Sequence, residues 1–133
     1  MSGVFLDTVG ILALWDQSDQ WHADADAAYG ELVAARTPLV TTNLILFECG
    51  NAAARRPYRK QVDQLRRLLQ QRNELLVPSA DDIEQAWNAY HRGEIGSAGI
   101  IDHVSFVVMR RMGITRAFTN DGHFQDAGFE SLF

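Results

Sequence analysis

The stretch VFLDTVGILALWD (residues 4–16) sets the fold of this chain. Its first part, Val4–Asp7, is a short apolar run that ends in an acid, which is typical of a buried strand. Apolar residues then recur at helical spacing, at Ile11, Leu14 and Trp15. We therefore predict a strand followed directly by a helix, which is the repeating unit of a parallel sheet covered by helices.

The same alternation continues to the end of the chain. Further strands are predicted at 38–42, 74–78 and 116–120, with a short fifth strand at Leu132–Phe133. Helices are predicted from Ser18 to about Arg36 and over 44–56, 58–73, 79–92 and 100–113. The pattern predicts an α/β protein, a three-layer α/β/α sandwich around a central, mainly parallel sheet of four or five strands.

Polar residues before three of these helices are predicted to be their N-caps. Ser18 and Asn43 each precede an apolar-periodic segment. Ser79 has Asp82 three residues later, which resembles a capping box with Asp in place of Glu. The glycine-rich stretch at 93–99 is predicted to be a loop.

The composition is that of one globular domain spanning residues 1–133, with 47% hydrophobic and 22% charged residues. The single cysteine, Cys49, rules out a disulfide framework and suits a reducing compartment. The N-terminal stretch MSGVFLDTVG has no basic segment and is unlike a signal peptide. No apolar run approaches the ~20 residues that span a bilayer. We therefore predict a cytoplasmic protein with no membrane segment.

Charge is distributed unevenly along the chain. The net charge of −5 is opposite in sign to that of most nucleic-acid-binding domains. Seven of the twelve basic residues nevertheless lie in one window, which we call the basic segment: Arg55, Arg56, Arg59, Lys60, Arg66, Arg67 and Arg72. This segment is either a contact surface for phosphates, a solvated helix face, or a match for an acidic partner.

Four acids lie at positions that indicate a functional site. Asp7 closes the first strand and Asp121 follows the fourth, and ligands of open α/β sheets bind at the carboxyl ends of strands. Glu48 and Asp102 each interrupt strongly apolar helical sequence, where an unpaired carboxylate is costly. Converging acids repel one another unless a divalent cation lies among them. Oxygen ligands without a histidine–cysteine cluster indicate Mg²⁺ or Mn²⁺.

Each of these acids also has a purely structural interpretation. Asp7 is placed to cap a helix, Asp102 to favour a helix dipole, and Asp121 to close a turn. Glu48 could pair with an arginine such as Arg55. The coincidence of four such acids favours a shared site over four separate structural roles.

The sequence leaves the role of one histidine open and assigns the three tryptophans to packing. His123, beside Phe124, is either a base or substrate contact or a packing residue. Trp15, Trp21 and Trp87 lie at apolar positions of predicted helices, and we predict that they belong to the core.

Four blocks, taken together in their order and spacing, resemble the PIN-domain family: VFLDTVGILALWD, TTNLILFECGNA, IIDHVSFVVMRRMGI and RAFTNDGHFQDAGF. The chain is most similar to small single-domain PIN proteins that include the VapC-type toxins of toxin–antitoxin pairs. The resemblance spans essentially the whole chain, although no single block would be specific. It implies an α/β/α nuclease with a parallel sheet and an acidic pocket that binds Mg²⁺ or Mn²⁺.

By motif position, the resemblance implies four catalytic and metal-binding acids: Asp7, Glu48, Asp102 and Asp121. It also implies three supporting polar residues beside the pocket: Thr8, Asn43 and Asn120. The implied reaction is metal-dependent hydrolysis of RNA phosphodiesters to 5′-phosphate and 3′-hydroxyl ends.

The resemblance further implies partners. They are an RNA substrate, an antitoxin protein whose tail covers the site, and a second copy of the chain in a homodimer formed by helices near the N-terminus. RNA phosphates would be contacted by residues that open the basic segment: Arg55, Arg56, Arg59 and Lys60.

One departure from the family pattern leaves an alternative open. Relatives commonly have Ser-x-Thr-Asp at the third acid, whereas this chain has Gly99-Ile100-Ile101-Asp102 and so lacks a supporting hydroxyl. Ser97 in the preceding loop either substitutes for it or does not. The alternative function is therefore a catalytically weak or inactive PIN-like module that binds RNA or protein.

Two other α/β families fit less well. A haloacid-dehalogenase-like phosphatase needs a second Asp two residues after the first, where this chain has Val9. A receiver domain needs an acid pair at the first strand and a lysine late in the sheet, whereas the only lysine here is Lys60.

Overall fold

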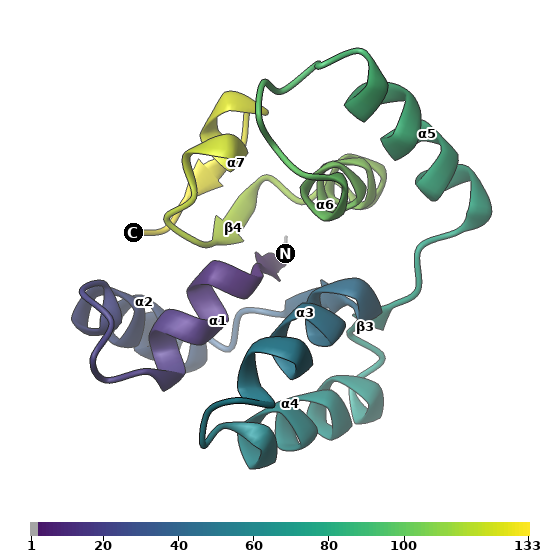
Figure 1. The fold of residues 1–133 in the computed structure, drawn as a ribbon. Helices are drawn as coiled ribbons and strands as arrows, with labels where there is room; N and C mark the ends of the chain where they lie inside the picture. The colour runs from purple at the N-terminus through teal and green to yellow at the C-terminus, as the bar shows by residue number, and fades with distance from the viewer. Residues whose placement is uncertain (1–2) are drawn as a thin grey trace.

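The computed structural model describes residues 3–133 and contains a five-stranded sheet in the order β3-β2-β1-β4-β5, in which every pair of neighbours is parallel. The strands are β1 (Val4–Leu6), β2 (Leu39–Thr42), β3 (Leu75–Leu76), β4 (Arg116–Phe118) and β5 (Glu130–Ser131). The helices are α1 (Thr8–Trp15), α2 (His22–Ala34), α3 (Asn43–Ala53), α4 (Arg59–Gln71), α5 (Ala80–His91), α6 (Ile100–Met112) and α7 (Gly122–Asp126). Figure 1 shows α5 and α6 on one side of the sheet and α1, α2 and α4 on the other, which confirms the predicted three layers.

β1 lies at the centre of the sheet, because it pairs with β2 on one edge and with β4 on the other. All three of its residues are buried, as its apolar sequence requires. The chain extends the sheet through β2 and β3 and then crosses to the opposite side of β1 with β4. In open α/β sheets, ligands bind where the strand order reverses in this way. The carboxyl ends of β1 and β4 therefore mark the expected position of a site.

Gly10 allows α1 to pack closely against β4. A Cβ atom at this position would lie 2.1 Å from the backbone oxygen of Phe118, which is far inside contact distance. The backbone N–H of Asp7 donates to the same oxygen, at 3.4 Å. A larger residue at position 10 would push the start of α1, with Asp7 and Thr8, away from the end of β4.

The predicted position of the fifth strand is wrong by two residues. β5 is Glu130–Ser131, because Glu130 is in register with Arg116 and Ser131 with Ala117. Residues 132 and 133 are instead partly buried and pack against the main core.

Two of the three predicted helix caps are wrong. α2 begins at His22, and the hydroxyl of Ser18 donates to Asp16 at 2.6 Å within the preceding loop. Asn43 is the first residue of α3, whose N-cap is Thr42, with a hydroxyl that accepts from a backbone N–H of the first turn. The third prediction is confirmed, because Ser79 and Asp82 form a reciprocal capping box at α5.

The prediction that all three tryptophans belong to the core is wrong for two of them. Trp15 is partly buried against the main core. Trp21 and Trp87 are 40% and 49% exposed. Within residues 3–133, none of the helices is long and apolar enough to span a membrane.

Candidate active site

Two of the four predicted acids lie just beyond the carboxyl ends of the central strands. Asp7 follows β1 and occupies the N-cap position of α1, but its side chain makes no capping hydrogen bond. Asp121 lies three residues after β4, and its carboxylate caps α7 by accepting from the N–H of His123 at 2.9 Å. Asp121 thus closes a turn, as its sequence suggested, and also faces the pocket.

The other two acids come from helices that pack beside this edge of the sheet. Asp102 lies in the first turn of α6. Glu48 lies within α3 and accepts a hydrogen bond of 2.7 Å from the hydroxyl of Thr8, which directly follows Asp7. The alternative in which Glu48 pairs with Arg55 is therefore not observed.

Asp7 is the deepest of the four acids, with 2% of its surface exposed. Its Oδ2 accepts a hydrogen bond of 2.8 Å from the hydroxyl of Thr119, a residue 112 positions away. The same hydroxyl accepts from the backbone N–H of Asp121, at 3.0 Å. Thr119 is fully buried and therefore ties the acid after β1 to the acid after β4.

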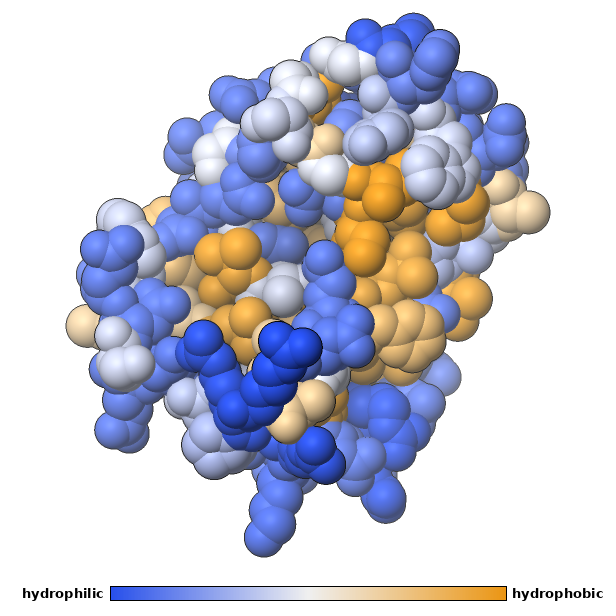
Figure 2. All heavy atoms as spheres, viewed as in Figure 1, coloured by the Kyte–Doolittle hydropathy of each residue, from blue (hydrophilic) through white to orange (hydrophobic). Residues whose placement is uncertain are grey.

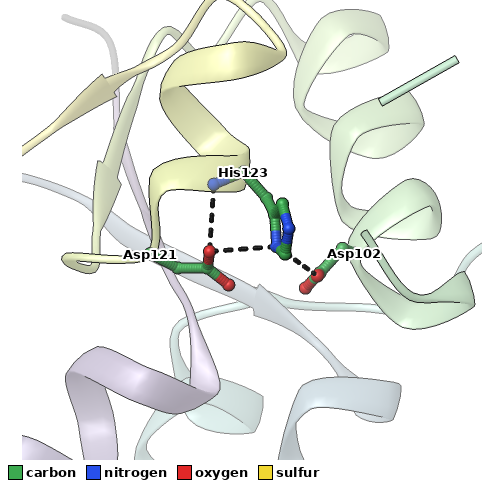
Figure 3. A group of neighbouring side chains, drawn as sticks. All are labelled: Asp102, Asp121 and His123. Atoms are coloured by element: carbon green, nitrogen blue, oxygen red, sulfur yellow. Dashed lines mark hydrogen bonds and ion pairs between the residues drawn. The ribbon is translucent and has the colours of Figure 1, made fainter. Parts of the chain in front are cut away.

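Asp102 and Asp121 approach each other through the ring of His123 (Figure 3). The Nδ1 atom of His123 lies 3.1 Å from Oδ1 of Asp121 and 3.7 Å from Oδ2 of Asp102. One ligand atom from each of the three residues can be chosen so that all lie within 4.8 Å of one another. The arrangement gathers potential ligands from α6 and from the start of α7.

Burial and mutual repulsion disfavour the ionised form of two acids in the pocket. Burial raises the pKa of Asp7 to about 7, and the neighbouring carboxylates of Asp102 and Asp121 add to this rise, while the Thr119 hydrogen bond opposes it. Burial also raises the pKa of Asp102, and the carboxylates of Asp121 and Glu48 act in the same direction. Within residues 3–133, no arginine or lysine forms an ion pair with any of these four acids, and His123 is the one basic side chain within ion-pair distance of them.

The PIN-domain family model matches residues 4–130, which is nearly the whole chain. The chain belongs to the PIN-domain family. It is 34% identical over 128 residues to the 23S rRNA-specific endonuclease VapC20 of Mycobacterium tuberculosis, in strains CDC 1551 / Oshkosh and H37Rv, with 95% of both chains covered. It is also similar to the crystal structure of M. tuberculosis VapC20, described as a sarcin–ricin loop cleaving toxin, with a TM-score of 0.79, 31% identity and 96% of both chains covered.

The pocket of this PIN domain fits a hard divalent cation. Its acids offer carboxylate oxygens, which are the ligands that Mg²⁺ and Mn²⁺ prefer. Asp7 is buried without a cationic partner among the described residues, and a carboxylate at such depth is costly unless its charge is compensated. A cation held among the acids would remove both the burial cost and the mutual repulsion.

The three predicted supporting residues lie in different surroundings. Thr8 donates to Glu48 and so belongs to the pocket of this PIN domain. Asn120 is half-buried between Thr119 and Asp121. Asn43 lines an apolar groove beside Phe47, and its Oδ1 is buried without a hydrogen-bond partner.

Ser97 does not replace the hydroxyl that is missing before Asp102. Its Oγ lies 3.1 Å from Nε2 of His123 instead. Sequence reasoning did not assign a role to Thr119 and left the role of His123 open. The sequence signal that could have indicated both is their closeness to Asp121, since each lies two residues from that acid.

The basic residues of this PIN domain are exposed where α3 ends and α4 begins. Arg56 forms an ion pair of 3.0 Å with Asp16, and Arg59 donates to the backbone oxygen of Ala54 at 3.0 Å. Farther along α4, Arg66 and Arg67 both pair with Asp63, at 2.8 and 2.9 Å. Part of the positive charge of the basic segment is therefore balanced within the chain.

Proposed function

We propose that this PIN domain is a divalent-cation-dependent endoribonuclease and the toxin of a toxin–antitoxin pair. The observation that supports this most is the gathering of four carboxylates at the switch point of the sheet, with no arginine or lysine of residues 3–133 paired to them. The names of the similar proteins point the same way, because they describe an rRNA-specific endonuclease and a toxin that cleaves an RNA loop.

The four acids would hold Mg²⁺ or Mn²⁺, with Asp7, Asp102 and Glu48 as the main ligands and Asp121 completing the site. When bound, such a cation supplies activation of water and neutralisation of phosphate charge. Thr119 orients the Asp7 carboxylate, and Thr8 orients that of Glu48. Each hydroxyl bonds one carboxylate oxygen, so we propose that the two threonines orient the donor set before RNA binds.

The proposed substrate class is RNA, and a stem-loop of 23S rRNA is the first substrate to test, because the similar M. tuberculosis endonuclease acts on that molecule. We propose that Arg55, Arg56, Arg59 and Lys60 contact phosphates outside the pocket. All four are exposed, and a surface of this kind compensates for a net charge of −5 that would otherwise repel RNA. Binding through them should weaken steeply as salt rises.

The proposed assembly is a homodimer that also pairs with an antitoxin. Figure 2 shows a band of hydrophobic residues on the right-hand side of the molecule. Phe47 and Val77, which are 61% and 72% exposed, line one groove, and we propose that this groove, in place of the helices near the N-terminus, forms the contact between two copies. Light scattering should report a dimer for the wild type and a monomer for Phe47→Asp; a wild-type monomer would refute this assembly. The proposed location is the cytoplasm, where ribosomal RNA lies.

The test is cleavage of a panel of structured and single-stranded RNAs, including a 23S rRNA stem-loop, by the purified chain with Mn²⁺, Mg²⁺ or EDTA. Asp7→Asn, prepared identically, should lose cleavage. Asp26→Asn, an exposed acid on α2, is the matched control and should cut like the wild type. Equal cleavage by Asp7→Asn, or cleavage in EDTA, would contradict the proposal. A folded wild type that binds RNA without cutting any member of the panel would favour the alternative, a binding module.

A further inference from the structure

The side chains of Ser97 and His123 connect the loop between α5 and α6 to the acidic pocket. Ser97 Oγ lies 3.1 Å from Nε2 of His123. On the opposite side of the ring, Nδ1 lies 3.1 Å from Oδ1 of Asp121, the oxygen that also accepts from the backbone N–H of His123 at 2.9 Å. Asp121 is therefore approached by two nitrogens of one residue (Figure 3). That residue is itself held by the hydroxyl of Ser97, which comes from a loop distant in the sequence.

We propose that Ser97 and His123 act as a positioning pair, which fixes the orientation of the Asp121 carboxylate and thereby the affinity of the pocket for a divalent cation. The inference rests on the proposed function, because it concerns the same four acids. It adds two residues whose contacts with the pocket run through Asp121 and, for His123, also reach Asp102.

The placement of protons supports this arrangement. A neutral imidazole carries one N–H, and an ionised carboxylate only accepts. Nδ1 is buried and lies near the carboxylates of Asp121 and Asp102 but makes no hydrogen bond of good geometry to either, so its contact with the acids is one of proximity. Beside two acceptor carboxylates, the tautomer with its N–H at Nδ1 is the favoured one. Nε2 is then an acceptor, and the hydroxyl of Ser97 is the donor that meets it. The serine thus favours the ring tautomer that places the N–H beside the acids and holds the ring in that position, in the way that outer partners orient metal-binding residues.

Ser97 is held in place although its own side chain is exposed. The next residue, Ala98, is 3% exposed, belongs to the main core, and donates its N–H to the backbone oxygen of Ile95 at 3.0 Å. The glycine-rich loop at 93–99 is therefore anchored immediately beside the serine.

The pair also reaches the deepest acid through Asp121. The backbone N–H of Asp121 donates to Thr119, and Thr119 donates to Asp7. A continuous set of contacts therefore runs from Ser97 through His123, Asp121 and Thr119 to Asp7. A change in the orientation of Asp121 should weaken cation binding, because the carboxylate oxygens of the pocket would no longer converge on one point.

The experiment is titration of the full chain with MnCl₂, with free Mn²⁺ followed by electron paramagnetic resonance. Ser97→Ala should bind Mn²⁺ about tenfold more weakly than the wild type. Ser97→Thr keeps the hydroxyl and should restore the affinity. Ser18→Ala removes an exposed hydroxyl that bonds Asp16, away from the pocket, and should bind like the wild type. The urea midpoint of Ser97→Ala should stay unchanged, so that weaker binding is not explained by a weaker fold.

A double-mutant cycle separates a pair from two independent residues. His123→Asn keeps an amide near the position of Nδ1 but cannot reach Ser97, so adding Ser97→Ala to it should cause no further loss of affinity. Losses that add, or a Ser97→Ala variant that binds Mn²⁺ as tightly as the wild type, would overturn the inference. Because Ser97→Ala changes an exposed side chain, it decides the question even where a His123 variant folds poorly.

Failure of the proposed function gives a different result. A wild type that binds Mn²⁺ but cuts no RNA would refute the ribonuclease and leave the pair to be judged from the affinities alone. A wild type that binds no Mn²⁺ would overturn both the metal dependence and the positioning pair.

Discussion

Asp7 and Asp82 are buried to the same extent, with 2% and 1% of their surfaces exposed, but the protein surrounds them differently. Asp82 accepts two hydrogen bonds from the guanidinium of Arg111, at 2.8 and 2.9 Å. It also accepts from the backbone N–H of Ser79 at 2.9 Å, which completes the capping box of α5. Asp7 has one side-chain partner, the hydroxyl of Thr119, and lies near further carboxylates.

The pKa values of the two aspartates are therefore shifted in opposite directions. The Arg111 hydrogen bonds lower the pKa of Asp82, and burial raises the pKa of Asp7 to about 7. The charge state of a buried carboxylate depends on its partners as well as on its depth. Asp82 is paired with the cationic side chain of Arg111 and has a structural role in capping α5. Asp7 has no cationic partner in the described part of the chain, which is the property expected of a metal ligand in the metal-free protein.

The largest expected effect is on the stability of the metal-free protein. Asp7 has a folded pKa of about 7 against its ordinary value of 3.8, so its contribution to stability is full below pH 3.8 and is lost as pH rises to about 7. Asp7→Asn removes this penalty and should stabilise the chain in EDTA at pH 8 by as much as about 4 kcal/mol. Urea unfolding should show a smaller gain at pH 5. A variant less stable than the wild type at pH 8 would show that Asp7 is not strained.

Asp82 should behave in the opposite way. Asp82→Ala leaves Arg111 without its partner and removes the capping box, and it should destabilise the fold by about 3 kcal/mol at pH 7. Because the folded pKa of Asp82 is lowered, its contribution is present above the unfolded pKa and is lost as pH falls through the folded value. Asp81→Ala, an exposed neighbour on α5, is the matched control. Equal urea midpoints for the two variants would contradict the structural role of Asp82.

These two acids also show what could be predicted from the sequence. The strand at Val4–Leu6 and the interruption of apolar helices by Glu48 and Asp102 are local signals, and the parallel α/β sandwich and the candidate acids follow from them. The capping box of Ser79 and Asp82 is also local, because both partners lie within one turn. The pairing of Asp82 with Arg111, 29 residues away, has no such signal.

The same limit applies at the candidate site and at the sheet edge. The role of Thr119 depends on a contact with a residue 112 positions away, and that of Ser97 on one across 26 positions. The register of β5 is set by its pairing with Arg116 rather than by its own residues. Thr42 and Asn43 are both good caps by residue type, and only the backbone decides that Thr42 takes the position.

A divalent cation should distinguish the two acids directly. Adding Mn²⁺ at about 100 times its dissociation constant should stabilise the wild type by about 2.7 kcal/mol. Asp82→Ala is less stable without Mn²⁺, but its free energy of unfolding should rise by the same amount when Mn²⁺ is added, because its acidic pocket is unchanged. Asp7→Asn should gain little, because it lacks a proposed main ligand. Urea unfolding at pH 7.5 with Mn²⁺ or EDTA measures all three, and an undiminished gain for Asp7→Asn would remove Asp7 from the ligands.

The smallest expected effect comes from the one hydroxyl that the protein does supply to Asp7. Thr119→Val keeps the shape of a fully buried side chain but removes the donor to Asp7 and the acceptor of the Asp121 N–H. It should cost about 1–2 kcal/mol of stability at pH 8.

The hydrogen bond from Thr119 opposes the rise in the pKa of Asp7, so its loss should raise that pKa further, and a carboxyl ¹³C titration by NMR would measure the shift. Thr119→Ser keeps the hydroxyl and should leave the Asp7 titration nearly unchanged. If Thr119→Val instead lowers the pKa of Asp7, the hydroxyl does not stabilise the ionised acid. Asp7 would then be even less compensated by the chain than its contrast with Asp82 indicates.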